Sequence, residues 1–278
     1  MPSDIKQTYY FHAEANPLGG YIEKPFQKHL PSQSSASLPA VGGHISNRTE
    51  DFNFEEIVSC RSAYSRISGV REGEDGSWWT LVTSVVEGLN ILEVVTADRV
   101  VAQISVEHPV DGGLGRISFT GSRFERLQIG GCDLSPVPNP SLLAYAPGAG
   151  AAQHRITWPL FQETGSRQAA KLIKSVEADN DRGATRWISE RYGWMGSKRK
   201  PGAPECVLCS LVESVDRGIP GKTFGHVVDI PHFGRVIFGE VVAYPGSVRL
   251  SMIRAELGCA THGGLSMASA IANGGPFP

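Results

Sequence analysis

The sequence predicts a mainly β protein, an antiparallel sandwich or β-roll that carries an α-helical insertion. Runs of β-branched residues recur about every 8–12 residues in the first half, which is the strand spacing of such folds. Gly and Pro, at 32 and 18 of the 278 residues, separate these runs. We therefore divide the chain into a β framework at residues 1–142, a basic helical insertion at 143–200 and a second part of the framework at 201–278.

The N-terminal residues predict two strands joined by a turn. Aromatic and β-branched residues occupy 9–13 and 21–23. The Asn-Pro and Gly-Gly pairs between them, at 16–20, are turn signals. Residues 27–44 are rich in Ser, Pro and Gly, and they predict a loop or an extended edge.

The rest of the first framework part predicts a series of strands. One or two are expected within residues 49–70, before a polar turn at 72–76. Further β-branched or aromatic runs follow, at 78–86, 89–95, 100–106, 117–119 and 124–129. The proline-rich residues 136–140 end this block.

The insertion has the periodicity of a helix. Its apolar side chains recur at i, i+3, i+4 and i+7, namely at Ala169, Leu172, Ile173 and Val176. Ser166 or Thr164 is a suitable N-cap for this helix. Residues 184–192 predict a second short helix that ends at Gly193. Basic residues outnumber acidic ones within 163–200, whereas the remaining chain is acidic.

Strands are expected again in the second framework part. Apolar runs at 226–230, 235–238, 240–244 and 248–253 predict a meander. Residues 206–215 fit a strand or one face of a helix. Because 211–215 repeat the pattern of an earlier strand at 81–85, we favour a strand for this segment.

Composition and charge exclude several functions. The formal net charge is −2, so no overall positive field attracts nucleic acid or an anionic membrane. Charged residues interrupt the apolar stretch at 80–104, so no membrane span is expected. The chain begins without a basic and apolar leader. The sequence as written therefore predicts a cytoplasmic protein, or a secreted or cell-surface one if a leader has been removed.

Several strings, taken in order, resemble one bacterial family. They are Gly-Leu-Asn-Ile-Leu at 88–92, Val-Thr-Ala-Asp-Arg-Val at 95–100, Leu-Gln-Ile-Gly-Gly at 127–131 with Pro-Asn at 138–139, Gly-Arg-Val-Ile-Phe-Gly-Glu at 234–240, and the stretches 246–253 and 266–270. This pattern is similar to that of the choice-of-anchor P proteins, over about residues 45–140 and 225–272. The resemblance implies an exported β-rich architecture and supplies no catalytic residues. The helical insertion has no counterpart in that pattern, and neither a leader nor an anchor is present as written.

Two short-spaced pairs of potential ligands suggest a metal site. Cys206 and Cys209 form one pair, and Cys259 and His262 form the other. Two such pairs supply the Cys3His ligand set of a tetrahedral zinc site. The alternatives are small buried strand cysteines, or a disulfide between Cys206 and Cys209. Zinc is the one cofactor that the sequence suggests.

Four tryptophans are candidate ligand or interface residues. Trp78 and Trp79 are adjacent on a predicted strand, so one must face the core and the other the second face of the sheet. An exposed tryptophan there stacks on a sugar or contacts a partner surface. The other two lie in or near the insertion, where they accompany a basic run.

That basic run is Lys198, Arg199 and Lys200, close to Trp187 and Trp194. Aromatic and cationic side chains together stack bases and hold phosphates. Only one short run supports this reading and the net charge opposes it, so we expect no nucleic-acid partner. The alternative is a solvated loop whose aromatics pack the insertion onto the framework.

Sequence motifs for catalysis give weaker evidence for a site than the metal-ligand pairs and the tryptophans do. The chain has no Gly-x-Ser-x-Gly elbow. His226, Asp229 and His232 could form an acid–base or metal cluster, but Pro231 lies between them and favours a turn. Gly-Lys-Thr at 221–223 lacks the glycine that a phosphate loop requires.

These observations favour a non-enzymatic, self-assembling structural protein. Its partner is expected to be a second copy of the chain, in a homo-oligomer or a surface or fibrous assembly, because an acidic framework and a basic insertion attract each other. The alternative is a carbohydrate- or protein-binding module that uses the tryptophans. A metal-dependent enzyme that uses the Cys and His residues ranks third.

Overall fold

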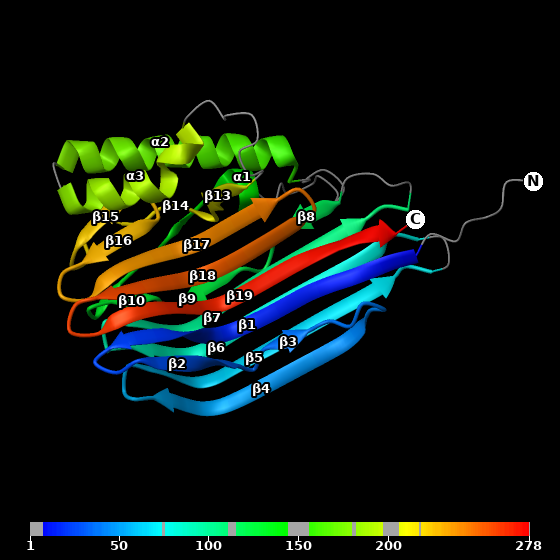
Figure 1. Cartoon of the computed structure of the whole chain (residues 1–278), viewed down its shortest axis with the longest axis horizontal. Helices are drawn as coiled ribbons and strands as arrows, with labels where there is room; N and C mark the ends of the chain where they lie inside the picture. The colour runs from blue at the N-terminus through cyan, green and yellow to red at the C-terminus, as the bar shows by residue number, and fades with distance from the viewer. Residues whose placement is uncertain are drawn as a thin grey trace, which may run out of the picture.

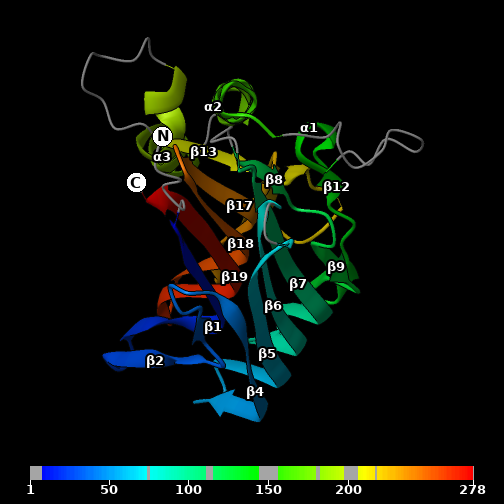
Figure 2. The ribbon, with the colours of Figure 1, turned by 90° about the vertical axis from the view of Figure 1, so that its right-hand side faces the viewer.

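The computed structural model describes residues 8–73, 76–110, 115–143, 156–179, 182–196, 206–216 and 218–277. Two antiparallel sheets face each other as an open sandwich, and helices lie against one end of it (Figures 1 and 2). Strands account for 60% of the described residues and helices for 17%. The predicted fold class, a mainly β antiparallel sandwich with a helical insertion, is confirmed.

Sheet A combines the two ends of the chain. Its main order is β15–β16–β17–β18–β19–β1–β2, while β13 pairs with β17 and β3 pairs with β1. The bounds are β1 Thr8–Lys24, β2 Lys28–Gln33, β3 Ala36–Ser37, β13 Val207–Ser210, β15 Lys222–Phe224, β16 Val227–Ile230, β17 Gly234–Tyr244, β18 Ser247–Gly258 and β19 His262–Phe277.

Sheet B is formed by the middle of the first framework part. Its order is β11–β10–β7–β6–β5–β4, and β8 and β9 also pair with β7. The bounds are β4 Gly43–Phe54, β5 Val58–Arg71, β6 Trp78–Ile91, β7 Val95–His108, β8 Arg116–Ser118, β9 Arg123–Glu125, β10 Gln128–Ile129 and β11 Cys132–Asp133. A separate small sheet pairs β12 Val137–Pro138 with β14 Val212–Ser214.

The N-terminal segment corrects one expectation. The predicted turn at 16–20 does not form, and β1 is a single strand of 17 residues. It pairs with β19 along nearly its whole length, and a Cβ at Gly20 would lie 2.3 Å from the carbonyl oxygen of Gly264. Pro17, which has no N–H to donate, lies between the stretches that pair with β2 and β3. Pairing with β19 therefore overrides the local turn signals.

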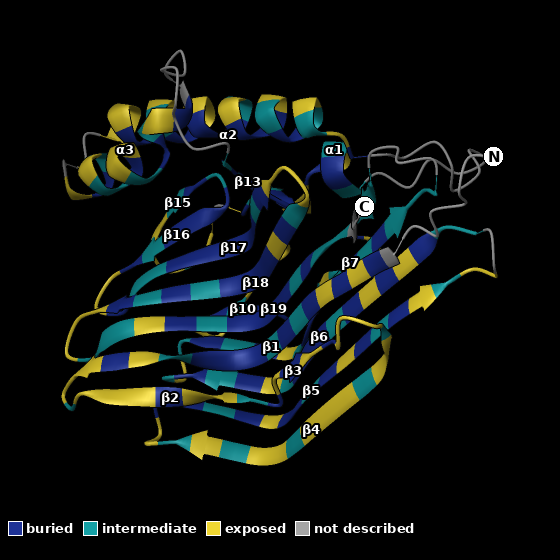
Figure 3. Ribbon diagram, turned by 45° about the vertical axis from the view of Figure 1, so that its right-hand side comes forward, coloured by how far each residue is buried: buried dark blue, intermediate teal, exposed yellow. Residues whose placement is uncertain are grey.

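The core lies between the two sheets. Strands β1 and β19 pack against β5, β6 and β7, and their inward side chains alternate with exposed ones (Figure 3). Tyr9 stacks on Trp78 with 5.1 Å between ring centroids, and Phe124 meets Phe238 edge to face at 5.9 Å. Trp78 is 5% exposed and Trp79 is 38% exposed, so the expected division between two faces is confirmed.

Helices α2 (Trp158–Asp179) and α3 (Arg182–Gly196) lie beside β13, within the predicted insertion, and a short α1 (Pro140–Leu143) precedes it (Figure 1). The expected cap is wrong. Ser166 and Thr164 lie inside α2, because Phe161 continues its buried face toward the N-terminus. The helix begins after Thr157, whose carbonyl accepts a hydrogen bond from the Phe161 N–H. Likewise, α3 continues past Gly193.

Residues 206–215 contain strands, as favoured from the sequence. The corner between β13 and β14 packs closely on Gly239 of β17, whose φ of 59° is left-handed. Its carbonyl accepts a hydrogen bond of 2.8 Å from the Leu211 N–H. A Cβ at Gly239 would lie 3.3 Å from that same nitrogen, so glycine allows this approach.

Candidate functional site

The outer face of sheet B carries a row of side chains that crosses five strands. The register aligns Arg48 of β4 with Tyr64, Val85 and Val101 of the next three strands, and Val101 with Arg123 of β9. With about 4.8 Å between neighbouring strands, the two arginines lie about 19 Å apart. The row is therefore long and open, with a cation at each end.

A second row runs beside the first. Here the register aligns Ser46, Arg66, Thr83 and Gln103. A hollow of about 550 Å³ lies over both rows. The second row supplies a guanidinium, hydroxyls and an amide, which are groups that bind carboxylates and sugar hydroxyls.

Tyr64 holds the arginines in place. Its hydroxyl accepts a hydrogen bond of 2.6 Å from Nη2 of Arg99. The guanidinium groups of Arg48 and Arg66 lie 5.6 and 5.7 Å from the centre of its ring. Such contacts between a cation and an aromatic ring are attractive, so Tyr64 reduces the rotational freedom of the surrounding cations.

Most of these arginines already contact carboxylates. Arg48 pairs with Glu50, and Arg123 pairs with Glu125 at 2.7 Å. Arg99 lies farther, at 3.5 Å, from its glutamate partner on β6. Arg66 is exposed, and within the described ranges no carboxylate lies within ion-pair distance of it. Arg66 is therefore a cation of this face that is available to a ligand.

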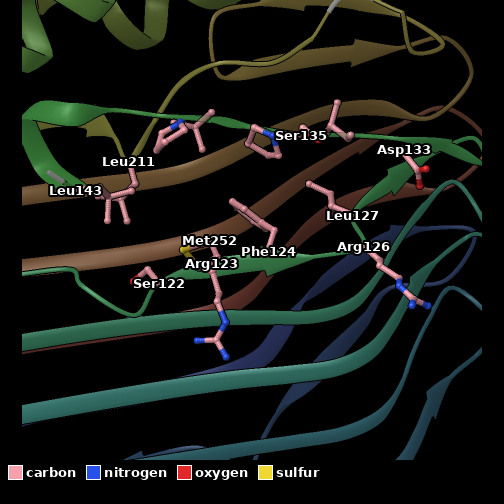
Figure 4. A pocket seen from close by; sticks show the side chains of 14 residues that line it. Ser122, Arg123, Phe124, Arg126, Leu127, Asp133, Ser135, Leu143, Leu211 and Met252 are labelled. Carbon is pink, nitrogen blue, oxygen red and sulfur yellow. The ribbon is translucent and has the colours of Figure 1, made fainter. Parts of the chain in front are cut away.

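A second hollow, of about 600 Å³, opens between the sheets (Figure 4). Its apolar wall includes Phe124, Leu127, Leu211 and Met252. Arg123 lines both this hollow and the one on the outer face, so the two are neighbours. Of its charged lining residues, Arg126 pairs with Asp98 at 3.4 Å and Asp133 accepts a hydrogen bond from the Gln128 amide at 2.8 Å.

The structure separates the predicted tryptophans. Trp78 is buried against Tyr9, which corrects its assignment as a surface contact. Trp79 points outward from sheet B, and its indole N–H donates to Glu72 at 3.2 Å. Two others lie on α3: Trp187 donates to Glu256 on sheet A at 2.9 Å, and Trp194 donates to a backbone carbonyl of its own helix. The four do not form one surface, and the basic run at Lys198, Arg199 and Lys200 lies outside the described residues.

The predicted zinc ligands are also apart. Cys206 precedes β13, which pairs with the Tyr244 end of β17, whereas Cys259 and His262 flank the turn between β18 and β19 at the other end. The length of β18 separates the two pairs by about 35 Å. Burial raises the pKa of the Cys209 thiol and opposes thiolate formation. The four residues do not form one site in this chain, and no disulfide joins Cys206 to Cys209.

His226, Asp229 and His232 do not form a cluster either. His226 is buried, and its Nε2 lies 3.3 Å from the hydroxyl of Tyr192. Asp229 pairs instead with Arg235 at 3.1 Å. His232 is exposed in the turn after β16, as the proline suggested. His226 thus lies in the turn before β16, Asp229 within the strand and His232 in the turn after it.

A buried ionic cluster beneath α3 was not expected from the sequence. Arg191 of α3 pairs with Glu240 of β17, which is only 4% exposed. Arg254 of β18 lies 3.8 Å from the same carboxylate. The sequence signal is a glutamate within the apolar run of β17 that follows Arg235. We interpret this cluster as the contact that docks α3 on sheet A.

A second ionic contact docks α2. Glu213 of β14 accepts hydrogen bonds from Arg167 and Lys171. Burial alone would raise the pKa of Glu213, but these two cations outweigh it and lower the pKa to about 2. The carboxylate therefore remains charged in the folded protein at pH values where it is protonated in the unfolded chain.

We expect Glu213→Gln to lower the free energy of unfolding near pH 7 by about 1–2 kcal/mol, a value reduced for solvent screening of the exposed cations. Because the folded pKa is depressed, this stabilisation is present above about pH 4.5 and is lost as the pH falls toward 2. Urea unfolding across this range measures it. Glu177→Gln, at an exposed position of α2, is the control, and an equal loss there would contradict the assignment.

Comparisons with known proteins identify a family. A family model described as Domain of unknown function (DUF8256) matches residues 9–244. Neither a curated protein nor a solved structure matches the chain. Within the described part of the chain, no helix has the length and apolar character needed to cross a membrane.

Proposed function

Because the chain belongs to the family described as Domain of unknown function (DUF8256), a description that names no activity, we propose a function from its own surface. The outer face of sheet B binds an acidic polysaccharide whose sugars carry carboxylate groups. This is the carbohydrate-binding alternative expected from the sequence, with Arg66, Tyr64 and Arg123 in place of the tryptophans. The exposed Arg66 beside Tyr64 is the observation that supports it.

The chemistry of the face fits a carboxylate. A guanidinium presents parallel N–H donors that match the two oxygens of a carboxylate. The arginines of this face already contact planar carboxylates of the protein, as Arg123 contacts Glu125. Thr83 and Gln103 lie in the same row as Arg66 and supply partners for sugar hydroxyls.

The shape of the face fits a polymer. The rows are open and cross several strands, so they would contact successive sugars rather than enclose one small molecule. Tyr64 orders the arginines before a ligand arrives, which lowers the entropic cost of binding. The net charge of −2 disfavours non-specific attraction to a polyanion, so binding would require this local surface.

We expect the protein to bind polygalacturonate, a polymer of carboxylated sugars, and Arg66→Gln to weaken that binding about tenfold. The reason is the loss of one charge-assisted contact on a solvated surface. Isothermal titration calorimetry on the full chain measures the Kd. Neutral dextran should not bind, because it lacks carboxylates.

The matched control is Arg249→Gln, which removes an exposed arginine from β18 of sheet A and should leave the Kd unchanged. If it weakens binding as much as Arg66→Gln does, overall charge and not this face governs binding. Absence of binding to polygalacturonate contradicts the proposal. Preferential binding of dextran sulfate would contradict the carboxylate assignment.

A further inference from the structure

Strand β4 forms one edge of sheet B, on the side of the sandwich away from the helices (Figure 1). Its 12 residues are exposed or half-buried throughout (Figure 3). Among the described residues, no strand pairs with its outer edge. An uncovered edge of this length is a template for pairing with another strand.

Hydrogen bonds with the segment between β2 and β3 hold β4 on the face that lies toward sheet A. The hydroxyl of Ser34 donates to Oγ1 of Thr49 at 2.7 Å, and the Asn47 amide donates to the carbonyl of Ser35 at 3.2 Å. Its other edge is paired with β5 along the strand. The backbone of β4 is therefore held in place up to Glu50 and would not have to order there on binding, whereas Asp51, whose φ of 49° is left-handed, interrupts the extended strand.

The hydrogen bonds show which residues point to the open edge. The Arg48 N–H donates to Oδ1 of Asn47 at 2.9 Å, and we therefore assign this N–H to the open edge. Because the N–H and C=O groups of successive strand residues point to opposite edges, Ser46, Arg48 and Glu50 direct theirs outward. Asn47 thus covers one of the donors that a partner strand would use.

We propose that β4 pairs with β4 of a second copy of the chain, antiparallel and about a two-fold axis at Thr49. This register places Arg48 opposite Glu50 of the partner subunit, and the axis repeats the contact. Both residues direct their backbone groups outward, as a hydrogen-bonded antiparallel pair requires. Their side chains would meet on one face, so the edge is complementary to itself in charge.

A second copy of the chain is a suitable partner for this edge, because each β4 contributes an arginine to one pair and a glutamate to the other. Arg48 and Glu50 now contact each other within each chain, and the dimer would exchange these two contacts, one per chain, for two contacts between subunits. The Asn47 contact competes with pairing, so the dimer is expected to be reversible. This proposal and polysaccharide binding share Arg48, which ends the outer row, whereas Arg66 lies on β5. Self-association measured without polysaccharide therefore tests the dimer by itself.

Sedimentation velocity on the full chain at increasing concentration tests the proposal. We expect a reversible dimer that weakens with added salt. Arg48→Glu or Glu50→Arg alone would place like charges opposite each other at both contacts. Either substitution should therefore raise the Kd of the dimer about 30-fold.

Two further samples separate loss of pairing from loss of folding. The double variant Arg48→Glu/Glu50→Arg restores opposite charges and should restore the dimer. An equimolar mixture of the two single variants should form a heterodimer, because one edge is then basic and the other acidic. A wild-type monomer at every concentration, or a dimer that neither single substitution weakens, would overturn the proposal.

Discussion

We expect Arg191→Met to lower the free energy of unfolding by about 3 kcal/mol. Arg191 joins α3 to a carboxylate, that of Glu240, which is 4% exposed on sheet A. Burial alone would lower the pKa of Arg191, but the charge and hydrogen bond of Glu240 raise it above its usual value. Arg191 is therefore charged in the folded protein.

The size of the effect follows from what the substitution leaves behind. Removing one partner of a buried ion pair leaves an uncompensated charge and costs about 3–5 kcal/mol. The lower end applies because Arg254 remains 3.8 Å from the Glu240 carboxylate. The guanidinium of Arg191 also lies 5.6 and 5.8 Å from the ring centres of Trp187 and Tyr192, so methionine loses these cation–ring contacts together with the ion pair.

Urea unfolding near pH 7 measures the change, and two variants test its cause. Arg186→Met, also on α3, breaks an exposed pair with Glu190 and should leave the free energy of unfolding nearly unchanged. Arg191→Met/Glu240→Gln removes both charges and should recover part of the loss, because no unpaired carboxylate remains. If the double variant were no more stable than Arg191→Met, buried charge would not be the cause.

The fold class could be predicted from the sequence because strand periodicity is local. The alternation that divides Trp78 from Trp79 depends only on adjacent positions. The continuity of β1 could not be predicted in the same way. Its partner β19 lies at the other end of the chain, and that pairing outweighs the Asn-Pro and Gly-Gly signals.

The candidate site depends on the register between strands, so the sequence patterns did not predict it. Arg48, Tyr64 and Arg123 come from three strands, and each looks ordinary in its own strand. They fall into one row across the sheet only after several hairpins have fixed which residues lie opposite each other. The reverse holds for the predicted zinc ligands: Cys206 and Cys259 each belong to a suggestive pair, yet β18 holds the pairs at opposite ends of the sheet.

We expect the buried imidazole of His226 to lower the free energy of unfolding in mild acid, which is the second large effect. Burial lowers the pKa of its imidazole from 6.5 to about 4, because a buried imidazolium loses its hydration. The unfolded chain therefore binds a proton as the pH falls below about 6.5, while the folded protein does not until about pH 4. This difference favours the unfolded state across that interval and has no effect above it.

The expected loss from His226 is about 2 kcal/mol between pH 7 and pH 5, from about 1.4 kcal/mol per unit of pKa difference. This interval lies above the one in which Glu213 titrates, so the two contributions separate on the pH axis. His226→Gln keeps a polar partner for the Tyr192 hydroxyl but does not titrate. Its stability should therefore change less between pH 7 and pH 5.

Urea unfolding of both proteins at each pH measures the difference in slope. His232→Asn is the matched control, because His232 is exposed and its φ of 62° is one that asparagine tolerates. This variant should retain the full loss of stability in acid. If His226→Gln retained it as well, the buried imidazole would not be its source, and other groups that are protonated in the unfolded chain would have to account for it.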